Sequence, residues 1–310
     1  MELFSFYNVE NLFLPDPTPR HRLDPTKSGL RNWDDRKYKN KLSRIAHVFQ
    51  LMKEDNGVMP FMIGLSEVSG KKVLEDLVQL KPFDSEYWIV HYNSMDERKV
   101  DVALLYDKNK VEVIDSEAIT FFFEITDRNT GSYDTTRDVL YSKVKYKGEI
   151  INVFIAHLPS KREKDINKPK RDFILNEIRG RILDIVREEE NVILCGDFNE
   201  NPDDENLVKI LHDNADRKVL ENPFQQLFST RNYSTFHYKS GLLFDQIILS
   251  NSFFKDSNVL HFQNAEVFSS AKISSRDRNF EGRPFRTYAG TRYLGGYSDH
   301  FPVFVRFTNL

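Results

Sequence analysis

The sequence has only one cysteine, Cys195, among its 310 residues. A disulfide bond within the chain is therefore impossible, and cysteine usage does not indicate a redox compartment. Cys195 lies in an apolar run, and its neighbours Leu194 and Gly196 supply no base that would activate a thiol. We therefore interpret Cys195 as a small buried hydrophobic residue in preference to a catalytic nucleophile.

Long apolar runs and a basic N-terminal segment are also absent. The first residues carry neither the positive charges nor the long apolar stretch of a signal peptide. No uninterrupted apolar run is long enough to span a bilayer. We expect a cytoplasmic protein without membrane insertion.

The chain lacks a strong net charge, since the formal value is −3. A globally basic surface is therefore excluded, and any contact with nucleic acid must come from a local patch. Hydrophobic residues make up 40% and charged residues 29%, which is typical of a globular protein. No feature of the sequence identifies a protein partner.

Apolar periodicity predicts a mixture of strands and helices. The expected strands cover residues 3–8, 61–66, 87–91, 100–106, 111–123, 139–146, 150–157, 192–195, 244–250 and 302–307, and the expected helices 38–52, 73–80, 173–189 and 207–211. Loops are expected over 9–35, 124–136 and 269–297. Because hairpins alternate with helical crossovers and no linker or repeat interrupts them, we predict a single α/β domain with mixed sheets over residues 1–310.

The first predicted helix has a one-sided apolar stripe at spacings of three and four residues. Its other face carries four basic residues, Lys37, Lys39, Lys41 and Arg44. We interpret that face as solvated.

Polar side chains stand at the ends of six apolar runs. They are Asn8, Glu67, His157, Asp197 with Asn199, Asp245, and Asp299 with His300. Each has an ordinary structural explanation: Asp197 and Asn199 suit a turn that closes a strand, and His157 suits a hydrogen-bonded core position. Six apolar runs that all end in such residues, at the strand ends where ligands bind in α/β proteins, together indicate a metal and phosphate site.

The residue types fit a hard divalent cation. Glu67, Asp299 and the amide oxygen of Asn8 are the oxygen donors that Mg2+ prefers, with Mn2+ as an alternative, and the set lacks the clustered cysteine and histidine of a zinc site. Adjacent residues on a strand point to opposite faces, so His300 needs a carboxylate partner from another strand. We predict Asp245 as this partner, which would fix the tautomer of the imidazole.

Six motifs in this order resemble the endonuclease/exonuclease/phosphatase superfamily, the DNase I-like metal hydrolases, and features near the C-terminus resemble a bacterial subgroup. They extend from residue 6 to residue 300: Phe6-Tyr7-Asn8-Val9-Glu10-Asn11, Gly64-Leu65-Ser66-Glu67-Val68, Ala156-His157-Leu158-Pro159-Ser160, Gly196-Asp197-Phe198-Asn199, Phe244-Asp245-Gln246-Ile247 and Ser298-Asp299-His300. The resemblance implies a four-layer α/β sandwich in which two packed mixed sheets are flanked by helices.

The resemblance also implies roles for these residues. On the metal side, Glu67 resembles the main ligand, Asn8 the supporting asparagine and Asp299 a further carboxylate. Arg137 resembles an arginine that reaches the phosphate in some members. Asp101 departs from the family pattern, because many members have a glycine near this position.

On the catalytic side, Asp197 resembles the residue that positions or activates the attacking water. Asn199 resembles the group that holds a phosphate oxygen, and His157 resembles the histidine that hydrogen-bonds the phosphate. Asp245 resembles the partner of the essential histidine, His300. The implied reaction is metal-assisted hydrolysis of a phosphate ester by in-line attack of water.

Three hypotheses follow for the activity. The first is a nuclease-type phosphodiesterase with DNA or RNA as substrate. Basic residues after residue 157 would supply a backbone-binding patch, unless they form a solvated loop: Lys161, Arg162, Lys164, Lys168, Lys170 and Arg171. The second is a phosphomonoesterase or small-headgroup phosphodiesterase of the inositol-phosphate or sphingomyelin type, which the negative net charge favours. The third is a non-catalytic binding protein on the same fold.

Overall fold

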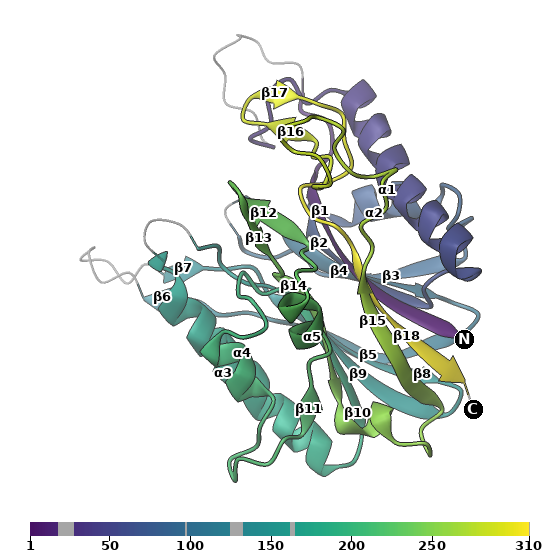
Figure 1. Ribbon diagram of the computed structural model, residues 1–310, viewed down its shortest axis with the longest axis vertical. Helices are drawn as coiled ribbons and strands as arrows, with labels where there is room; N and C mark the ends of the chain where they lie inside the picture. The colour runs from purple at the N-terminus through teal and green to yellow at the C-terminus, as the bar shows by residue number, and fades with distance from the viewer. Residues whose placement is uncertain (18–27, 97, 125–132, 162–164, 310) are drawn as a thin grey trace.

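Two six-stranded mixed sheets pack face to face in the computed structural model, and helices cover their outer faces (Figure 1). The structure describes residues 1–17, 28–96, 98–124, 133–161 and 165–309. Helices α1 and α2 lie outside one sheet, and α3 and α4 lie outside the other. The predicted four-layer α/β arrangement is therefore confirmed.

The strands of the two sheets are listed here in spatial order. The first sheet contains β15 (Leu260–Val267), β18 (Val303–Asn309), β1 (Glu2–Leu12), β2 (Met62–Val68), β4 (Asp101–Asp107) and β3 (Tyr87–His91). The second contains β11 (Leu220–Glu221), β14 (Asp245–Ser250), β10 (Asn191–Asp197), β9 (Glu149–His157), β8 (Val139–Tyr146) and β5 (Val111–Ile119). Each sheet has one parallel pair at its centre, β1 with β2 and β9 with β10. A long helix makes each parallel crossover, as this connection requires.

The first crossover helix, α1 (Asp35–Asn56), has a signal at each end. The side chain of Asp34 accepts a hydrogen bond from the amide of Lys37, and Gly57 adopts a left-handed conformation after the last turn. The other helices are α2 (Lys71–Val78), α3 (Lys168–Arg187), α4 (Glu205–Ile210), α5 (Phe224–Ser229) and the 3-10 helix η2 (Asn251–Phe254). No helix in the described part of the chain has an apolar stretch of membrane-spanning length.

Three short hairpins lie outside the two sheets. They are β6 (Phe122–Glu124) with β7 (Tyr133–Thr135), β12 (Thr235–His237) with β13 (Ser240–Leu242), and β16 (Tyr288–Ala289) with β17 (Arg292–Tyr293). The expected strand over 111–123 is therefore interrupted, because β5 ends at Ile119 and the chain then turns into a separate hairpin. Most of the expected loop over 124–136 lies outside the described residues.

Two more expectations about strands were wrong. The first strand does not end at Asn8 but continues to Leu12 through an irregularity in its pairing with β2. Strand β15 was not expected at all, because most of its side chains are only partly buried at the edge of a sheet and show no clean alternation. The extension of β1 matters for the site, because it places Glu10 beside the other predicted residues.

The basic face of α1 is only partly solvated, which corrects the expectation from its sequence: Lys39 is exposed, but Lys37 and Lys41 are buried. Lys41 is fully buried, and its Nζ donates to Thr287 Oγ1 and to the carbonyl of Tyr297, both at 2.6 Å. Burial lowers the pKa of Lys41 to about 8, although attraction from Glu10 opposes this change. These contacts fasten residues 285–297, which we call the strap, to helix α1.

Gly196 permits the close approach of β9 and β10. A Cβ atom at this position would lie 2.2 Å from the carbonyl oxygen of Ala156. We expect Gly196→Ala to lower the free energy of unfolding by about 1–3 kcal/mol through this clash. Gly180 is the control, because it is exposed on α3 and no atom lies within 4 Å of its added Cβ. Gly180→Ala should raise the free energy of unfolding by about 0.5–1 kcal/mol. Equal stabilities of the two variants in urea unfolding would contradict this account.

Candidate functional site

The predicted site residues meet at one end of the two sheets. At this end the parallel pairs β1–β2 and β9–β10 finish, and the antiparallel strands β14 and β18 begin. The strand register places Asp197 beside His157 on one neighbouring strand and beside Asp245 on the other. Residues from distant parts of the sequence are thus brought together because their strands share this edge.

The amide of Asn8 connects the two sheets within the site. Its Nδ2 lies 3.0 Å from Asp197 Oδ2 on the second sheet and 3.3 Å from Glu67 Oε1 on the first. Its Oδ1 accepts a hydrogen bond from the backbone amide of Glu10. Asn8 is fully buried, so all of these contacts are shielded from bulk water. Asn8 therefore fixes Asp197 and Glu67 relative to each other.

The backbone around the site adopts unusual conformations. Glu10, Asn11, Glu67 and Asn199 have φ values between 50° and 62°, in the left-handed region that non-glycine residues seldom adopt. Three of these residues lie where the pairing of β1 and β2 becomes irregular. Such irregularities redirect side chains next to active sites, and here they turn carboxylates toward one cavity.

His300 and Asp245 form the pair expected from the sequence. His300 Nδ1 lies 2.7 Å from Asp245 Oδ2, and Asp245 is fully buried. Burial alone would lower the pKa of His300, but the attraction and the hydrogen bond of Asp245, together with Asp197, raise it well above its ordinary value. His300 is therefore an imidazolium held between two carboxylates.

His157 has the opposite electrostatic environment. Its pKa is lowered well below the ordinary value, first by burial and then by repulsion from Arg137 and His300. The neutral ring has Nε2 at 3.6 Å from Asp197 Oδ2 and at 3.9 Å from Glu67 Oε1. Its buried Nδ1 has no hydrogen-bond partner among the described residues. His157 can thus direct one ring nitrogen toward the space between these carboxylates.

Asp197 lies at the centre of the cluster. Its pKa is raised to about 6: burial and Asp245 raise it, and together they outweigh the lowering by His300 and by the hydrogen bonds from Asn199 and Asn8. The backbone amide of Asn199 donates to Asp197 Oδ1 at 3.0 Å. A carboxylate held by donors and with a raised pKa is suited to accept a proton from water.

Two further predicted residues lie beside this cluster. The side-chain amide of Asn199 donates to the carbonyl of Leu158 at 2.9 Å, and Arg137 Nη1 contacts the same carbonyl at 3.4 Å. Arg137 is close enough to Glu67 and Asp197 to be attracted by both, and its buried Nε has no hydrogen-bond partner among the described residues. Arg137 therefore retains a free donor near the cluster.

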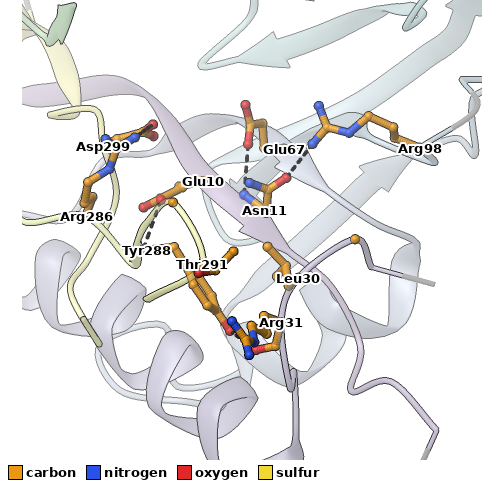
Figure 2. Close-up of a pocket in the computed structure, with 12 residues that line it drawn as sticks. Glu10, Asn11, Leu30, Arg31, Glu67, Arg98, Arg286, Tyr288, Thr291 and Asp299 are labelled. Carbon is orange, nitrogen blue, oxygen red and sulfur yellow. Dashed lines mark hydrogen bonds and ion pairs between the residues drawn. The ribbon is translucent and has the colours of Figure 1, made fainter. Parts of the chain in front are cut away.

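Glu67 and Asp299 line a cavity of about 310 Å³ on the other side of the site (Figure 2). Glu10 lines the same cavity, although the sequence analysis assigned it no role. Burial raises the pKa of Glu10 to about 7, with a further contribution from Asp299. Both carboxylate oxygens of Glu10 accept hydrogen bonds from the backbone amides of Thr287 and Tyr288, at 2.6 Å and 3.3 Å. The carboxylates of Glu67 and Asp299, next to a buried asparagine, remain the donors that fit a hard divalent cation, which prefers oxygen ligands.

Glu10 was missed although the sequence contained a signal for it. Asn8 and Glu10 are two residues apart at the end of the first strand, and side chains at this spacing lie on the same face of a strand. The expected end of the strand at Asn8 hid this relationship. The arginines of the cavity had no such signal, because they come from separate loops.

Among the described residues, Asp197, Asp245 and His300 are the group of three whose metal-ligating atoms all lie within 4.8 Å of one another. The hydrogen bond between His300 Nδ1 and Asp245 occupies one of these atoms. Since the raised pKa keeps His300 protonated, its positive charge disfavours a cation there. The carboxylates predicted from the sequence as metal ligands, Glu67 and Asp299, lie at the cavity instead.

The basic residues after residue 157 that the structure describes are largely paired with carboxylates. Arg171 is fully buried and paired with Glu200 and Asp165, and Lys161 is also paired with Glu200. Lys168 forms an ion pair with its helical neighbour Asp172. Arg162 and Lys164 lie outside the described residues. The described part of this run therefore mainly stabilises the start of α3.

Residues 3–309 match the model of a family described as the Endonuclease/Exonuclease/phosphatase family. A search among curated proteins found no significant match.

Solved structures share the fold at low sequence identity. A mannosyl-6-phosphatase of Bacteroides thetaiotaomicron is 17% identical with a TM-score of 0.61, covering 99% of this chain and 100% of that one. D. rerio TDP2, solved in complex with a single-strand DNA product, is 16% identical with a TM-score of 0.60, covering 99% of each chain. An endonuclease/exonuclease/phosphatase from Bacteroides vulgatus is 16% identical with a TM-score of 0.60, covering 100% of this chain and 99% of that one.

The high pKa of His300 depends chiefly on Asp245. We expect Asp245→Asn, which keeps the shape of the side chain, to lower the pKa of His300, because the remaining burial favours the neutral ring. Titration of the imidazole followed by nuclear magnetic resonance measures this change. Asp256→Asn is the control, since Asp256 is fully exposed and remote from the site. An unaltered titration in Asp245→Asn would remove the electrostatic role assigned to the pair.

Proposed function

The chain belongs to the Endonuclease/Exonuclease/phosphatase family, whose members are metal-dependent phosphoester hydrolases, and we propose that it hydrolyses phosphate esters of small molecules. The observation that carries this proposal is the cavity of about 310 Å³ next to the Asp197 and His300 cluster. This volume is at the lower end of the range for small-molecule sites, roughly 300–1,000 Å³. A compact phosphorylated molecule fits such a space better than a polymer.

We assign the metal to Glu67 and Asp299, with Asn8 supporting Glu67 through its amide. When bound, a divalent cation, for which we propose Mg2+, polarises a phosphoryl oxygen as a Lewis acid.

The chain's own residues then act on the phosphoryl group. His157 and the imidazolium of His300 flank Asp197, with Nε2 atoms at 3.6 Å and 3.9 Å from Asp197 Oδ2. Donors in these positions stabilise the negative charge that develops on phosphoryl oxygens. Arg137 and Asn199 lie beside the same space and supply further donors.

Asp197 orients the attacking water in this mechanism. Asn8 and the backbone amide of Asn199 hold its carboxylate in place, and these hydrogen bonds favour the ionised form that accepts a proton. Burial raises its pKa and makes it a stronger base than an exposed aspartate.

A nuclease-type phosphodiesterase is the second candidate. The specific observation in its favour is a set of exposed arginines at the rim of the cavity, Arg31, Arg98 and Arg286, which offer contacts for a nucleic-acid backbone. The similarity to TDP2 in complex with a DNA product is compatible with this activity. The internal pairing of Lys161, Lys168 and Arg171 argues against an extended binding track.

Asp197→Asn and His300→Ala should each lower kcat/KM for phosphate release by about 10²–10⁴, the usual contribution of a general acid or base. The assay uses Mg2+ with phosphorylated sugars, phosphorylated polyols and plasmid DNA. The exposed variant Asp256→Asn serves as the control. Turnover like the wild type in both site variants would refute these roles. Plasmid nicking without phosphate release from small esters would select the nuclease instead.

Glu67→Gln should raise the Mg2+ concentration for half-maximal activity by about tenfold or more, because one negative charge of the donor set is lost. Calorimetric titration of the metal gives the same comparison without substrate. Glu75→Gln on the exposed side of α2 is the matched control. If the metal titration of Glu67→Gln coincides with that of the wild type, Glu67 is not a ligand.

A further inference from the structure

The cavity extends away from the reacting centre. Its lining includes Glu67 and Asp299 but none of Asp197, His157 and His300. Glu67 lies between the two regions, since its Oε1 is 3.9 Å from His157 Nε2. A substrate with one phosphate at the histidines therefore places the rest of its body in the cavity.

Three arginines line the cavity from different sides (Figure 2). Arg286 lies beside Asp299, with an ion pair at 2.8 Å. Arg98 lies beside Glu67 and Asn11, and one of its nitrogens donates to Asn11 Oδ1 at 2.8 Å. Arg31 lies on a third side, near Tyr288 and Thr291.

The backbone of Arg31 is held in place by hydrogen bonds, but its guanidinium has no partner among the described residues. The carbonyl of Arg31 accepts hydrogen bonds from Tyr288 Oη at 2.9 Å and from Lys37 Nζ at 3.1 Å. Its guanidinium makes no hydrogen bond or ion pair with any residue that the structure describes. Fixing the backbone while leaving the guanidinium available lowers the entropic cost of binding an anion.

The charges of the cavity are arranged for an anion. Its lining has three arginines and three carboxyl groups, those of Glu10, Glu67 and Asp299, so a divalent cation bound there makes the cavity positive. Arginine recognises phosphate through paired, charge-assisted hydrogen bonds. Arg31 and Arg98 are the two arginines of the cavity that form no ion pair with a described residue.

The lining residues also restrict the chemical class of the part of the substrate that lies in the cavity. Leu30 and Tyr288 are the only large apolar side chains among the lining residues. Tyr288 is buried, and its hydroxyl is engaged by the carbonyl of Arg31. The described lining thus offers little surface on which a base could stack, whereas a hydroxylated body can hydrogen-bond to the polar walls.

We propose that Arg31 and Arg98 form a subsite for a second phosphate group, and that the preferred substrate is a small sugar or polyol carrying two phosphates. This inference rests on the proposed function, because it takes the first phosphate to be the reacting one. It assigns to the cavity the choice among substrates, while the histidine and aspartate cluster carries out the reaction.

The test compares fructose 1,6-bisphosphate with fructose 6-phosphate in two measurements. The first is kcat/KM with Mg2+ for the wild type, Arg31→Ala and Arg98→Ala. The second is the Kd by calorimetry with Ca2+ in the Asp197→Asn background. We expect the bisphosphate to be preferred in both, and each arginine variant to reduce that preference about tenfold, as for a lost charged hydrogen bond. Arg36→Ala is the control, since Arg36 is exposed on α1 near Arg31 but does not line the cavity.

The outcomes separate this inference from the proposed function. If both sugars are hydrolysed with the same kcat/KM and bound with the same Kd, and the arginine variants change neither value, the subsite is overturned. The proposed hydrolase activity would still stand. Tighter binding of the bisphosphate that depends on Arg31 or Arg98, without hydrolysis of either sugar, would support the subsite and refute the proposed reaction. Both arginines are exposed, and equal thermal unfolding of the variants and wild type verifies that the fold is retained.

Discussion

The site depends on the hydrogen bonds of one buried amide, that of Asn8. Its nitrogen contacts Asp197 on one sheet and Glu67 on the other, so the two halves of the site are fixed relative to each other where the sheets meet. A buried amide left without its partners would be costly, and this cost maintains the alignment of the sheets at their edge. The strand register then determines the positions of His157 and Asp245, because each lies beside Asp197 on a neighbouring strand.

Within this frame, neighbouring groups favour different protonation states in the two histidines. His300 is buried between Asp245 and Asp197 and holds a proton, whereas His157 is buried near Arg137 and loses it. Burial lowers the pKa of both rings, so the difference comes from the signs of the adjacent charges. A neutral and a charged imidazole on either side of one carboxylate give the site separate groups for hydrogen bonding and for charge stabilisation.

The sequence predicted what strand ends determine and missed what long-range packing determines. Glu67, His157, Asp197 and Asp245 lie at the ends of buried strands, and Asn8 ends an apolar run within β1. Their gathering at one edge follows from these apolar runs and from the rule that ligands bind at strand ends. The length of β1 was underestimated because residues 9–12 combine apolar and polar side chains across an irregular pairing, and Glu10 was lost with it. The burial of Lys41 was unpredictable from the local pattern, because its partners Thr287 and Tyr297 lie about 250 positions away and no helical periodicity reports them.

The distribution of paired and unpaired cations argues for a compact substrate. A protein that tracks a nucleic-acid backbone needs many cations free to replace counterions along an extended path. Here Lys161 and Arg171 are committed to Glu200, and Lys41 is committed to the strap. The arginines of the cavity without an ion pair to described residues, Arg31 and Arg98, instead surround a space of about 310 Å³. Cations concentrated around a small space recognise a few charges at fixed separation, and this arrangement favours a small molecule with closely spaced phosphates over a polymer.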